Sequence, residues 1–235
     1  MSAIRRVGHK GADLIVPGNT VASFDAALAA GVDMIEFDIL PERETGRLIL
    51  AHDPNEARRG NPQTLEEGLA HLTSPAFEGL DFDVDLKATG YEDRVVEALR
   101  RHGLLERSLV CSQHLRSLDR LRELEPALRV GWSVPRASTD YTQKPLVGWM
   151  AVGAVLIYRQ LLPRRAARAL RIGRVDAIMA HWRVVTPRLV DEVRAAGGDL
   201  YAWTVDDAAR IRALARLGVT GVISNDPRLF YALPA

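Results

Sequence analysis

Short apolar segments alternate with amphipathic segments along almost the whole chain. Short apolar runs of this kind are typical of buried strands, whereas apolar residues that recur every three to four positions are typical of helices. The alternation of the two indicates repeated βα units around a parallel sheet. The predicted strands cover residues 4–9, 33–39, 81–87, 107–112, 129–133, 153–157, 175–180, 199–204 and 219–224. The predicted helices cover residues 19–31, 65–73, 91–103, 115–125, 163–171, 187–197 and 206–217.

The number of strands and the chain length favour one particular α/β fold. The 235 residues suit a single (β/α)8 barrel of the TIM type, and no linker or low-complexity stretch divides them. We therefore predict one barrel domain over residues 1–235. Nine strands are one too many for this barrel, so either 153–157 or 175–180 lies outside it, and periodicity does not decide which.

Composition and charge narrow the classes of function. The chain is 47% hydrophobic and 26% charged, with a formal net charge of +1, so no global field attracts nucleic acid or an anionic membrane. The single cysteine, Cys111, excludes an internal disulfide and reads as a small core residue. No apolar run is long enough for a signal peptide or a membrane span, so we expect a cytoplasmic protein. The sequence leaves its oligomeric state open.

Two acidic residues alternate with apolar residues in the predicted strand 33–39. The apolar residues share one face, so Glu36 and Asp38 project from the other. Their backbones are then about 6–7 Å apart, close enough for both side chains to chelate one cation. Oxygen ligands suit a hard ion such as Mg²⁺ or Ca²⁺. Taken alone, the pattern also fits an amphipathic strand whose acidic face lies in solvent.

The predicted strand 81–87 repeats this alternation with four ionisable residues on one face, namely Asp81, Asp83, Asp85 and Lys87. Inside a barrel these groups would be costly to bury without a metal, a phosphate or water. Barrel active sites form at the carboxyl ends of the strands. Asp85 is therefore a candidate third metal ligand and Lys87 a candidate phosphate contact, whereas we expect water to solvate Asp81 and Asp83 near the start of the strand.

Two histidines are expected at strand ends. His9 ends the first predicted strand, and His52 ends a segment, 41–53, that reads as a small hairpin at the barrel mouth. A lone histidine is more often a structural residue. Two histidines beside a carboxylate-bound metal have the chemistry that acid–base cleavage of a phosphodiester needs, because one accepts a proton and the other donates one.

In order along the chain, these segments resemble the glycerophosphodiester phosphodiesterase family. The matching pieces are His9-Lys10-Gly11, Pro17-Gly18-Asn19-Thr20, Glu36-Phe37-Asp38, His52-Asp53, Asp85-Leu86-Lys87, Ala202-Trp203-Thr204-Val205-Asp206 and Gly218-Val219-Thr220-Gly221-Val222-Ile223-Ser224-Asn225-Asp226-Pro227. No single piece is specific, but the ordered set spans nearly the whole chain.

The resemblance implies a TIM-type barrel that hydrolyses glycerophosphodiesters to an alcohol and glycerol 3-phosphate. The implied ligands of one divalent cation, Mg²⁺ or Ca²⁺, are Glu36, Asp38 and Asp85. The implied acid–base pair is His9 and His52. The metal would neutralise charge that develops on the phosphoryl oxygens.

The same resemblance implies three contacts to the substrate. Lys10 and Lys87 would hold the phosphate, and Trp203 would form an apolar wall near the glycerol. Packing within the barrel is an equally good explanation for Trp203.

The chain departs from the usual family pattern in four places. Lys10 replaces an arginine and so offers a point charge in place of a bidentate fork. Gly18 replaces a glutamate, which removes one polar contact near the site, and Asp85 is one methylene shorter than the usual glutamate. Only ten residues separate Asp53 from Thr64, where the family usually carries a longer insertion over the substrate.

Three functions remain open at this point. The first is hydrolysis of small glycerophosphodiesters. The second is a phospholipase D-like activity on lysophospholipids or other phosphodiesters, with a cyclic phosphate as an alternative product. The third is a catalytically inactive barrel retained for binding. A small-molecule phosphodiester is the expected partner, and charge balance and aromatic spacing give no support to nucleic-acid binding.

Overall fold

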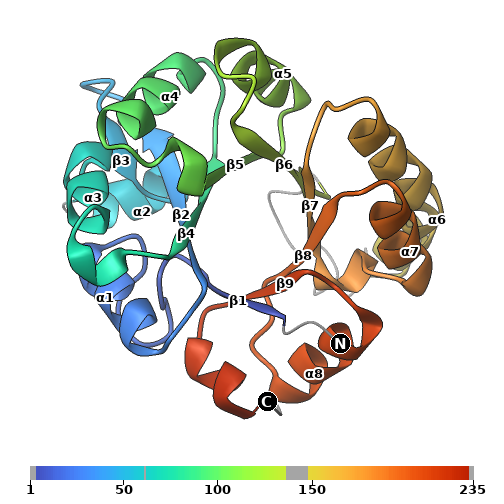
Figure 1. The fold of residues 1–235 in the computed structure, drawn as a ribbon. Helices are drawn as coiled ribbons and strands as arrows, with labels where there is room; N and C mark the ends of the chain where they lie inside the picture. The colour runs from blue at the N-terminus through green and yellow to red at the C-terminus, as the bar shows by residue number, and fades with distance from the viewer. Residues whose placement is uncertain (1–3, 61, 136–147, 233–235) are drawn as a thin grey trace.

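Eight parallel strands close into a barrel in the part of the chain that the structure describes (Figure 1). The computed structural model describes residues 4–60, 62–135 and 148–232. The barrel strands are β1 (Arg5–Gly8), β2 (Met34–Pro41), β4 (Asp81–Leu86), β5 (Ser108–Ser112), β6 (Arg129–Val134), β7 (Ala177–His181), β8 (Asp199–Trp203) and β9 (Gly221–Ser224). Strand β1 pairs with both β2 and β9, which closes the sheet. The predicted fold class is confirmed.

Helices surround the barrel (Figure 1). Apart from α2 and α3, which together follow the β3 hairpin, each helix connects one barrel strand to the next and returns the chain to the opposite end. They are α1 (Val21–Ala29), α2 (Pro54–Arg59), α3 (Leu65–Leu72), α4 (Glu92–Arg101), α5 (Leu115–Leu124), α6 (Gly148–Arg171), α7 (Pro187–Ala195) and α8 (Ala208–Leu217). Shorter 3₁₀ turns are η1 (Pro75–Phe77), η2 (Leu105–Arg107), η4 (Trp182–Val184) and η5 (Pro227–Ala232). Among the described residues, no helix is both long and apolar enough to cross a membrane.

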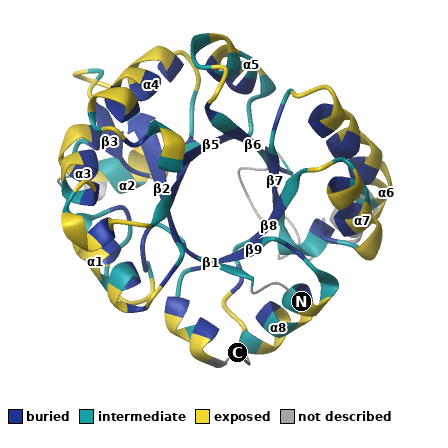
Figure 2. Cartoon of the chain, in the orientation of Figure 1, coloured by how far each residue is buried: buried dark blue, intermediate teal, exposed yellow. Residues whose placement is uncertain are grey.

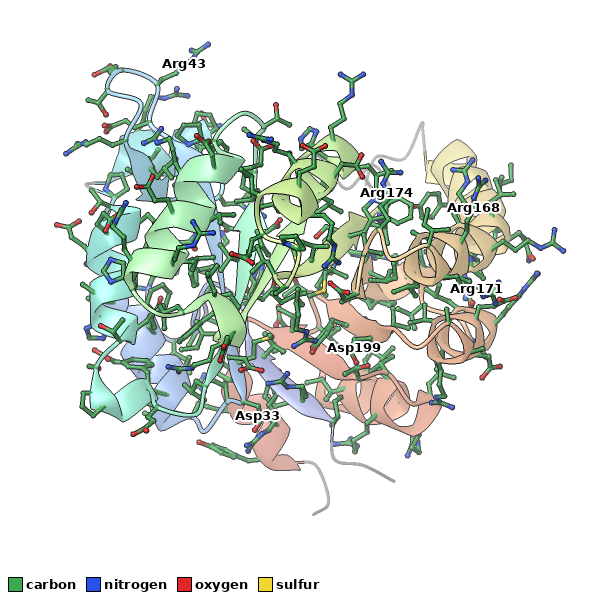
Figure 3. All side chains as sticks on the ribbon, turned by 45° about the horizontal axis from the view of Figure 1, so that its top comes forward. Asp33, Arg43, Arg168, Arg171, Arg174 and Asp199 are labelled. Atoms are coloured by element: carbon green, nitrogen blue, oxygen red, sulfur yellow. The ribbon has the colours of Figure 1, made fainter. Side chains whose placement is uncertain are left out.

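The predicted strand 153–157 is wrong, because these residues lie within helix α6. The predicted strand 175–180 corresponds to β7, which is the barrel strand. A short apolar run does not by itself distinguish a strand from a buried helix segment. The predicted helix 163–171 is the last part of α6, and the helix continues through Pro163, although proline more often marks a helix start. Arg168 and Arg171 point outward from this helix in Figure 3.

Most strand residues of the barrel are buried, as their dark colour in Figure 2 indicates, and most of these buried residues are apolar. The outward-facing side chains of β2 pack against the surrounding helices. A smaller inner cluster fills the barrel and consists of Val7, Met34, Leu109, Cys111, Ala177, Met179, Tyr201 and Ile223. Cys111 is thus a buried core residue, and burial raises the pKa of its thiol.

The expectation that water solvates Asp83 is wrong. Its side chain faces the barrel interior, where the residue is 2% exposed, and burial raises the pKa of its carboxyl group to about 7. Leu109 of the inner cluster lies opposite Asp83 on β5, and this packing leaves Asp83 little exposure to solvent. Asp81, one layer lower, forms an ion pair with Arg5 at 2.5 Å.

A hairpin extends β2 at the barrel mouth, as segment 41–53 predicted. Strand β3 (Leu48–Leu50) pairs antiparallel with the last residues of β2. The chain then enters the six-residue helix α2, which with a few flanking residues forms the whole connection to α3. The hairpin and α2 therefore place His52 beside the carboxyl end of β2.

Candidate active site

The predicted site residues gather at the carboxyl ends of β1, β2, β4 and β8. In the parallel pairing of β2 with β4, Glu36 lies opposite Asp83 and Asp38 lies opposite Asp85. A cavity of about 490 Å³ opens at these strand ends. The predicted residues that line it are His9, Lys10, Glu36, His52, Asp85, Lys87 and Trp203. Asp38 is 0% exposed and lies among them.

Three carboxylates form a compact acidic cluster. Glu36, Asp38 and Asp85 each offer an oxygen, and these oxygens all lie within 4.8 Å of one another. Asp85 Oδ1 is buried and accepts no hydrogen bond from the described residues. A hard divalent ion takes oxygen ligands at about 2.0–2.6 Å, so small side-chain adjustments would let these three residues share one ion. The donor set fits Mg²⁺ or Ca²⁺.

The ammonium of Lys87 lies within this cluster. Its Nζ is 2.6 Å from Asp38 Oδ1 and 2.6 Å from Asp85 Oδ2. Burial alone would lower the pKa of Lys87, but the nearby carboxylates outweigh it and raise the pKa well above its usual value. Burial likewise disfavours an ionised Asp38, yet Lys87 and His52 hold the pKa of Asp38 well below its usual value. Asp38 is therefore a carboxylate.

Glu36 experiences a different balance of effects. Burial and the neighbouring Asp38 carboxylate raise the pKa of Glu36 well above its usual value. Two adjacent buried carboxylates cannot both ionise cheaply without a cation. Because a bound divalent ion would supply that charge, the arrangement of Glu36 beside Asp38 suits a metal site.

The ring of His9 is oriented by an amide. His9 follows β1, and its Nδ1 lies 2.5 Å from Asn225 Oδ1. The Asn225 amide is held in turn, because its Nδ2 donates to Asp206 Oδ2 at 2.6 Å. Nδ1 of His9 therefore donates to Asn225, which leaves the lone pair on Nε2. Burial lowers the pKa of His9 and favours this neutral ring.

His52 is oriented by a carboxylate instead. Its Nδ1 lies 3.2 Å from Asp38 Oδ2, and 45% of its side chain is exposed. The Asp38 carboxylate therefore fixes the orientation of the His52 ring. The two histidines thus have contrasting surroundings, with one held by a neutral amide and the other by an anion.

Lys10 turns its backbone into the site. Its φ of +49° lies in the left-handed region, which a side chain seldom adopts. In this conformation its N–H donates to Glu36 Oε2 at 2.7 Å, and its Nζ lies 3.3 Å from Glu56 Oε2. The strained backbone therefore orients a metal-ligand candidate, while the ammonium lies on the cavity wall.

Both explanations of Trp203 fit its position. The indole lines the cavity, and it also packs against the inner cluster. Its Nε1 donates to the Met179 carbonyl at 2.8 Å, and the ring of His181 meets it edge-on at a centroid distance of 5.2 Å. Trp203 is thus a fixed wall of the cavity and a part of the barrel packing.

Sequence reasoning missed the roles of three polar residues. Asn19 binds Asp38, Asn225 orients His9, and Glu56 contacts Lys10. Asn19 and Asn225 stand in the motifs quoted above, and Asn225 directly follows β9, which is where barrel sites recruit residues. No local pattern singles out Glu56, because its contacts come from residues distant in the chain.

Comparison with known proteins identifies the family of this chain. A family model described as the glycerophosphoryl diester phosphodiesterase family matches residues 9–64 and 63–229. A glycerophosphodiester phosphodiesterase of Caldanaerobacter subterraneus subsp. tengcongensis is 24% identical, and the alignment covers 94% of this chain and 93% of that protein.

Two solved structures show the same fold. A glycerophosphodiester phosphodiesterase from Agrobacterium tumefaciens superposes with a TM-score of 0.71 at 19% identity and covers 98% of this chain and 100% of its own. An Oleispira antarctica phosphodiesterase in complex with the product sn-glycerol-3-phosphate also gives a TM-score of 0.71 at 19% identity, and the match covers 97% of this chain and 96% of that one. With the family model matching most of its length, this chain belongs to the glycerophosphoryl diester phosphodiesterase family.

Proposed function

We propose that this protein is a metal-dependent hydrolase that cleaves glycerophosphodiesters to an alcohol and glycerol 3-phosphate. As a member of its family it is a phosphoric diester hydrolase. The observation that carries the proposal is the shared cavity, in which two differently oriented histidines flank the acidic cluster. The named relatives and the glycerol 3-phosphate in the Oleispira structure support the substrate class.

The histidines divide the proton transfers between them. His9, neutral with its lone pair on Nε2, is suited to accept a proton from the attacking hydroxyl or water. His52, paired with the Asp38 carboxylate, is suited to donate a proton to the leaving alkoxide. The fixed orientation of each ring through its Nδ1 contact would hold both proton-transfer atoms toward one phosphate.

Glu36, Asp38 and Asp85 would hold one divalent cation, Mg²⁺ or Ca²⁺. When bound, such an ion neutralises negative charge on the phosphoryl oxygens. Lys10 and Lys87 add two ammonium groups on the cavity wall, which favour binding of an anionic phosphate. Because the chain's net charge is only +1, this local positive charge would select the phosphate.

In the part of the chain that the structure describes, the alcohol half of the substrate meets few residues beyond the barrel mouth. The short connection through α2 leaves no long segment to fold over a glycerol moiety. Lys10 tolerates more phosphate poses than an arginine fork would. We therefore propose broad and modest activity that includes lysophospholipids and aryl phosphodiesters, as well as glycerophosphocholine.

The test is catalytic efficiency across these three substrate types, with the released phosphate ester identified by mass spectrometry. Glycerol 3-phosphate from glycerophosphocholine would support the proposal, whereas a cyclic product would indicate the alternative reaction. A sharp preference for one small glycerophosphodiester would contradict the broad substrate range that we propose from the short connection through α2. An inactive wild-type protein that still binds glycerol 3-phosphate would favour the binding barrel. We further propose that residues 1–235 act as one domain in the cytoplasm.

A further inference from the structure

Helix α2 is fixed directly to the turn that carries His52. Its N-cap is Asp53, whose Oδ1 accepts hydrogen bonds from the Asn55 and Glu56 amides at 2.6 and 3.0 Å, and Pro54 occupies the first helical position. Glu56 is thus the third residue of this helix. Its side chain points back toward the start of the helix and into the site.

The carboxylate of Glu56 accepts from three different segments. Oε2 accepts from Lys10 Nζ at 3.3 Å and from the His52 backbone amide at 3.2 Å. Oε1 accepts from Asn19 Nδ2 at 3.1 Å. A single side chain therefore joins the proposed phosphate-binding lysine, the turn of a proposed catalytic histidine and the asparagine that binds Asp38.

Helix capping does not account for all of these contacts. Glu67 holds the same third position in α3, and its Oε2 accepts from the Thr64 backbone amide at 2.7 Å, as in an ordinary capping box. Glu56 reaches one residue further back and also binds two side chains. The additional contacts to Lys10 and Asn19 distinguish Glu56 from a capping residue.

The surroundings require two acceptor oxygens. Each oxygen of Glu56 faces an N–H donor, and the Asn19 amide cannot reverse without losing the bond from the Asp38 amide to its Oδ1 at 2.9 Å. Glutamine would turn an NH₂ group toward one of these donors. A carboxylate is therefore the group that satisfies all three partners.

Position 18, where the family pattern usually has a glutamate, cannot supply an acidic group here. A Cβ on Gly18 would lie 2.6 Å from Asp13 Oδ1 and 2.7 Å from Lys10 Cβ, so the backbone here leaves no room for a side chain. Glu56 supplies an acidic group beside Lys10 from the short segment between Asp53 and Thr64.

We propose that Glu56 is a positioning residue of this active site, which fixes the Lys10 ammonium and the His52 turn relative to Asp38. The inference rests on the proposed phosphodiesterase function and adds to it a residue outside the motifs quoted for the family. Mutation of a residue that orients the ligands of a metal site commonly lowers activity by about 10–100-fold. We expect Glu56→Gln and Glu56→Ala to lower kcat by about tenfold or more with a smaller change in KM.

Coupling to Lys10 is tested by a double-mutant cycle on glycerophosphocholine and an aryl phosphodiester. If Glu56 acts through Lys10, the loss caused by Glu56→Gln shrinks to less than about threefold in a Lys10→Met background. Equal losses in both backgrounds would overturn this coupling. If the kcat of Glu56→Gln lies within about twofold of that of an active wild type, the positioning role is overturned.

The matched control is Glu67→Gln, which removes the same charge from the same helical position. It should leave kcat unchanged, and both variants should shift the melting temperature by a similar small amount. Glu56→Asp, which keeps the charge, should recover part of the activity. If Glu67→Gln loses as much kcat as Glu56→Gln, helix capping explains the effect of Glu56 and the proposal is contradicted.

Hydrogen exchange separates this inference from the proposed function, because it needs no turnover. The His52 amide should exchange at least about tenfold faster in Glu56→Ala than in wild type, whereas Glu67→Ala should not affect it. A wild-type protein that hydrolyses no phosphodiester would contradict the function alone. Unchanged exchange at His52 in Glu56→Ala would contradict the positioning role, whatever the activity.

Discussion

Asn19 and Asp38 are joined by two hydrogen bonds across the site. Asn19 Nδ2 donates to Asp38 Oδ2 at 3.0 Å, and the Asp38 backbone amide donates to Asn19 Oδ1 at 2.9 Å. Asn19 is 2% exposed and has a φ of +57°, a conformation that asparagine tolerates better than most residues. The left-handed turn before α1 therefore fixes the carboxylate that both binds Lys87 and orients His52.

Replacing Asn19 by aspartate should disable the site without a change of size. The new carboxylate would face Asp38 Oδ2, where the amide now donates, and two buried anions would repel each other. We expect kcat/KM to fall by at least about a hundredfold. Asn55→Asp makes the same chemical change on an exposed side chain of α2 and should have little effect. Near-normal activity of Asn19→Asp would show that the Asn19 amide does not hold Asp38.

Activity should depend on a divalent cation held by the acidic cluster. Excess chelator should abolish turnover, and Mg²⁺, Mn²⁺ or Ca²⁺ should restore it. Asp85→Asn should raise the dissociation constant of the metal by about tenfold or more, because it removes one charged ligand. Isothermal titration calorimetry measures this constant. Asp81→Asn, which alters the Arg5 pair at the far end of the barrel, should leave metal affinity unchanged. Full activity of verified metal-free protein would contradict the metal assignment.

Replacing either proposed catalytic histidine by alanine should lower turnover far more than replacing a third histidine nearby. His9→Ala and His52→Ala should each lower turnover by about a hundredfold or more while the circular dichroism spectrum stays native. His181 also lies at the end of a barrel strand, β7, but its ring packs against Trp182 and Trp203. A greater loss in His181→Ala than in either of the others would mean that the wrong histidines have been chosen.

An ion pair at the opposite end of the barrel should make stability depend on acid pH. Asp33 accepts from the Arg6 backbone amide at 2.8 Å and from its guanidinium at 2.7 and 3.0 Å, which ties β1 to the start of β2. Figure 3 shows Asp33 near the lower edge of the molecule. Burial opposes ionisation of Asp33, but the bonds from Arg6 outweigh it and lower the pKa of Asp33 below 3.8.

A carboxyl group whose pKa is lower in the folded protein than in the unfolded chain stabilises the fold at pH values above its unfolded-state pKa. This stabilisation is lost as the pH falls through the folded-state pKa. Asp33→Asn should therefore reduce the free energy of unfolding by about 1 kcal/mol near pH 7, a modest figure because the pair is partly exposed. The difference should shrink below pH 3.8. Urea unfolding at several pH values measures it, with Asp191→Asn on the exposed face of α7 as the control. A difference that does not vary with pH would contradict the ion-pair explanation.

The alternation of residue types predicts the barrel and the shared faces of several candidate site residues, whereas their roles rest on the family resemblance. A period of two places Glu36 and Asp38 on one face of β2, whatever surrounds the strand, because successive side chains point to opposite sides. Parallel strands then bring their carboxyl ends to one mouth, which unites these residues with His9, Asp85 and Lys87. These conclusions depend only on local geometry and on the rules of one fold.

The remaining features depend on contacts between distant parts of the chain. Residues 153–157 lie in the continuous helix α6, although their apolar run also suits a strand. Asp83 is buried because the inner cluster fills the barrel around it. The polar partners Asn19, Asn225 and Glu56 become visible only when loops meet across the mouth. Hydrogen bonds are short-ranged, so the periodicity of single segments cannot assign partners that only the closed barrel brings together.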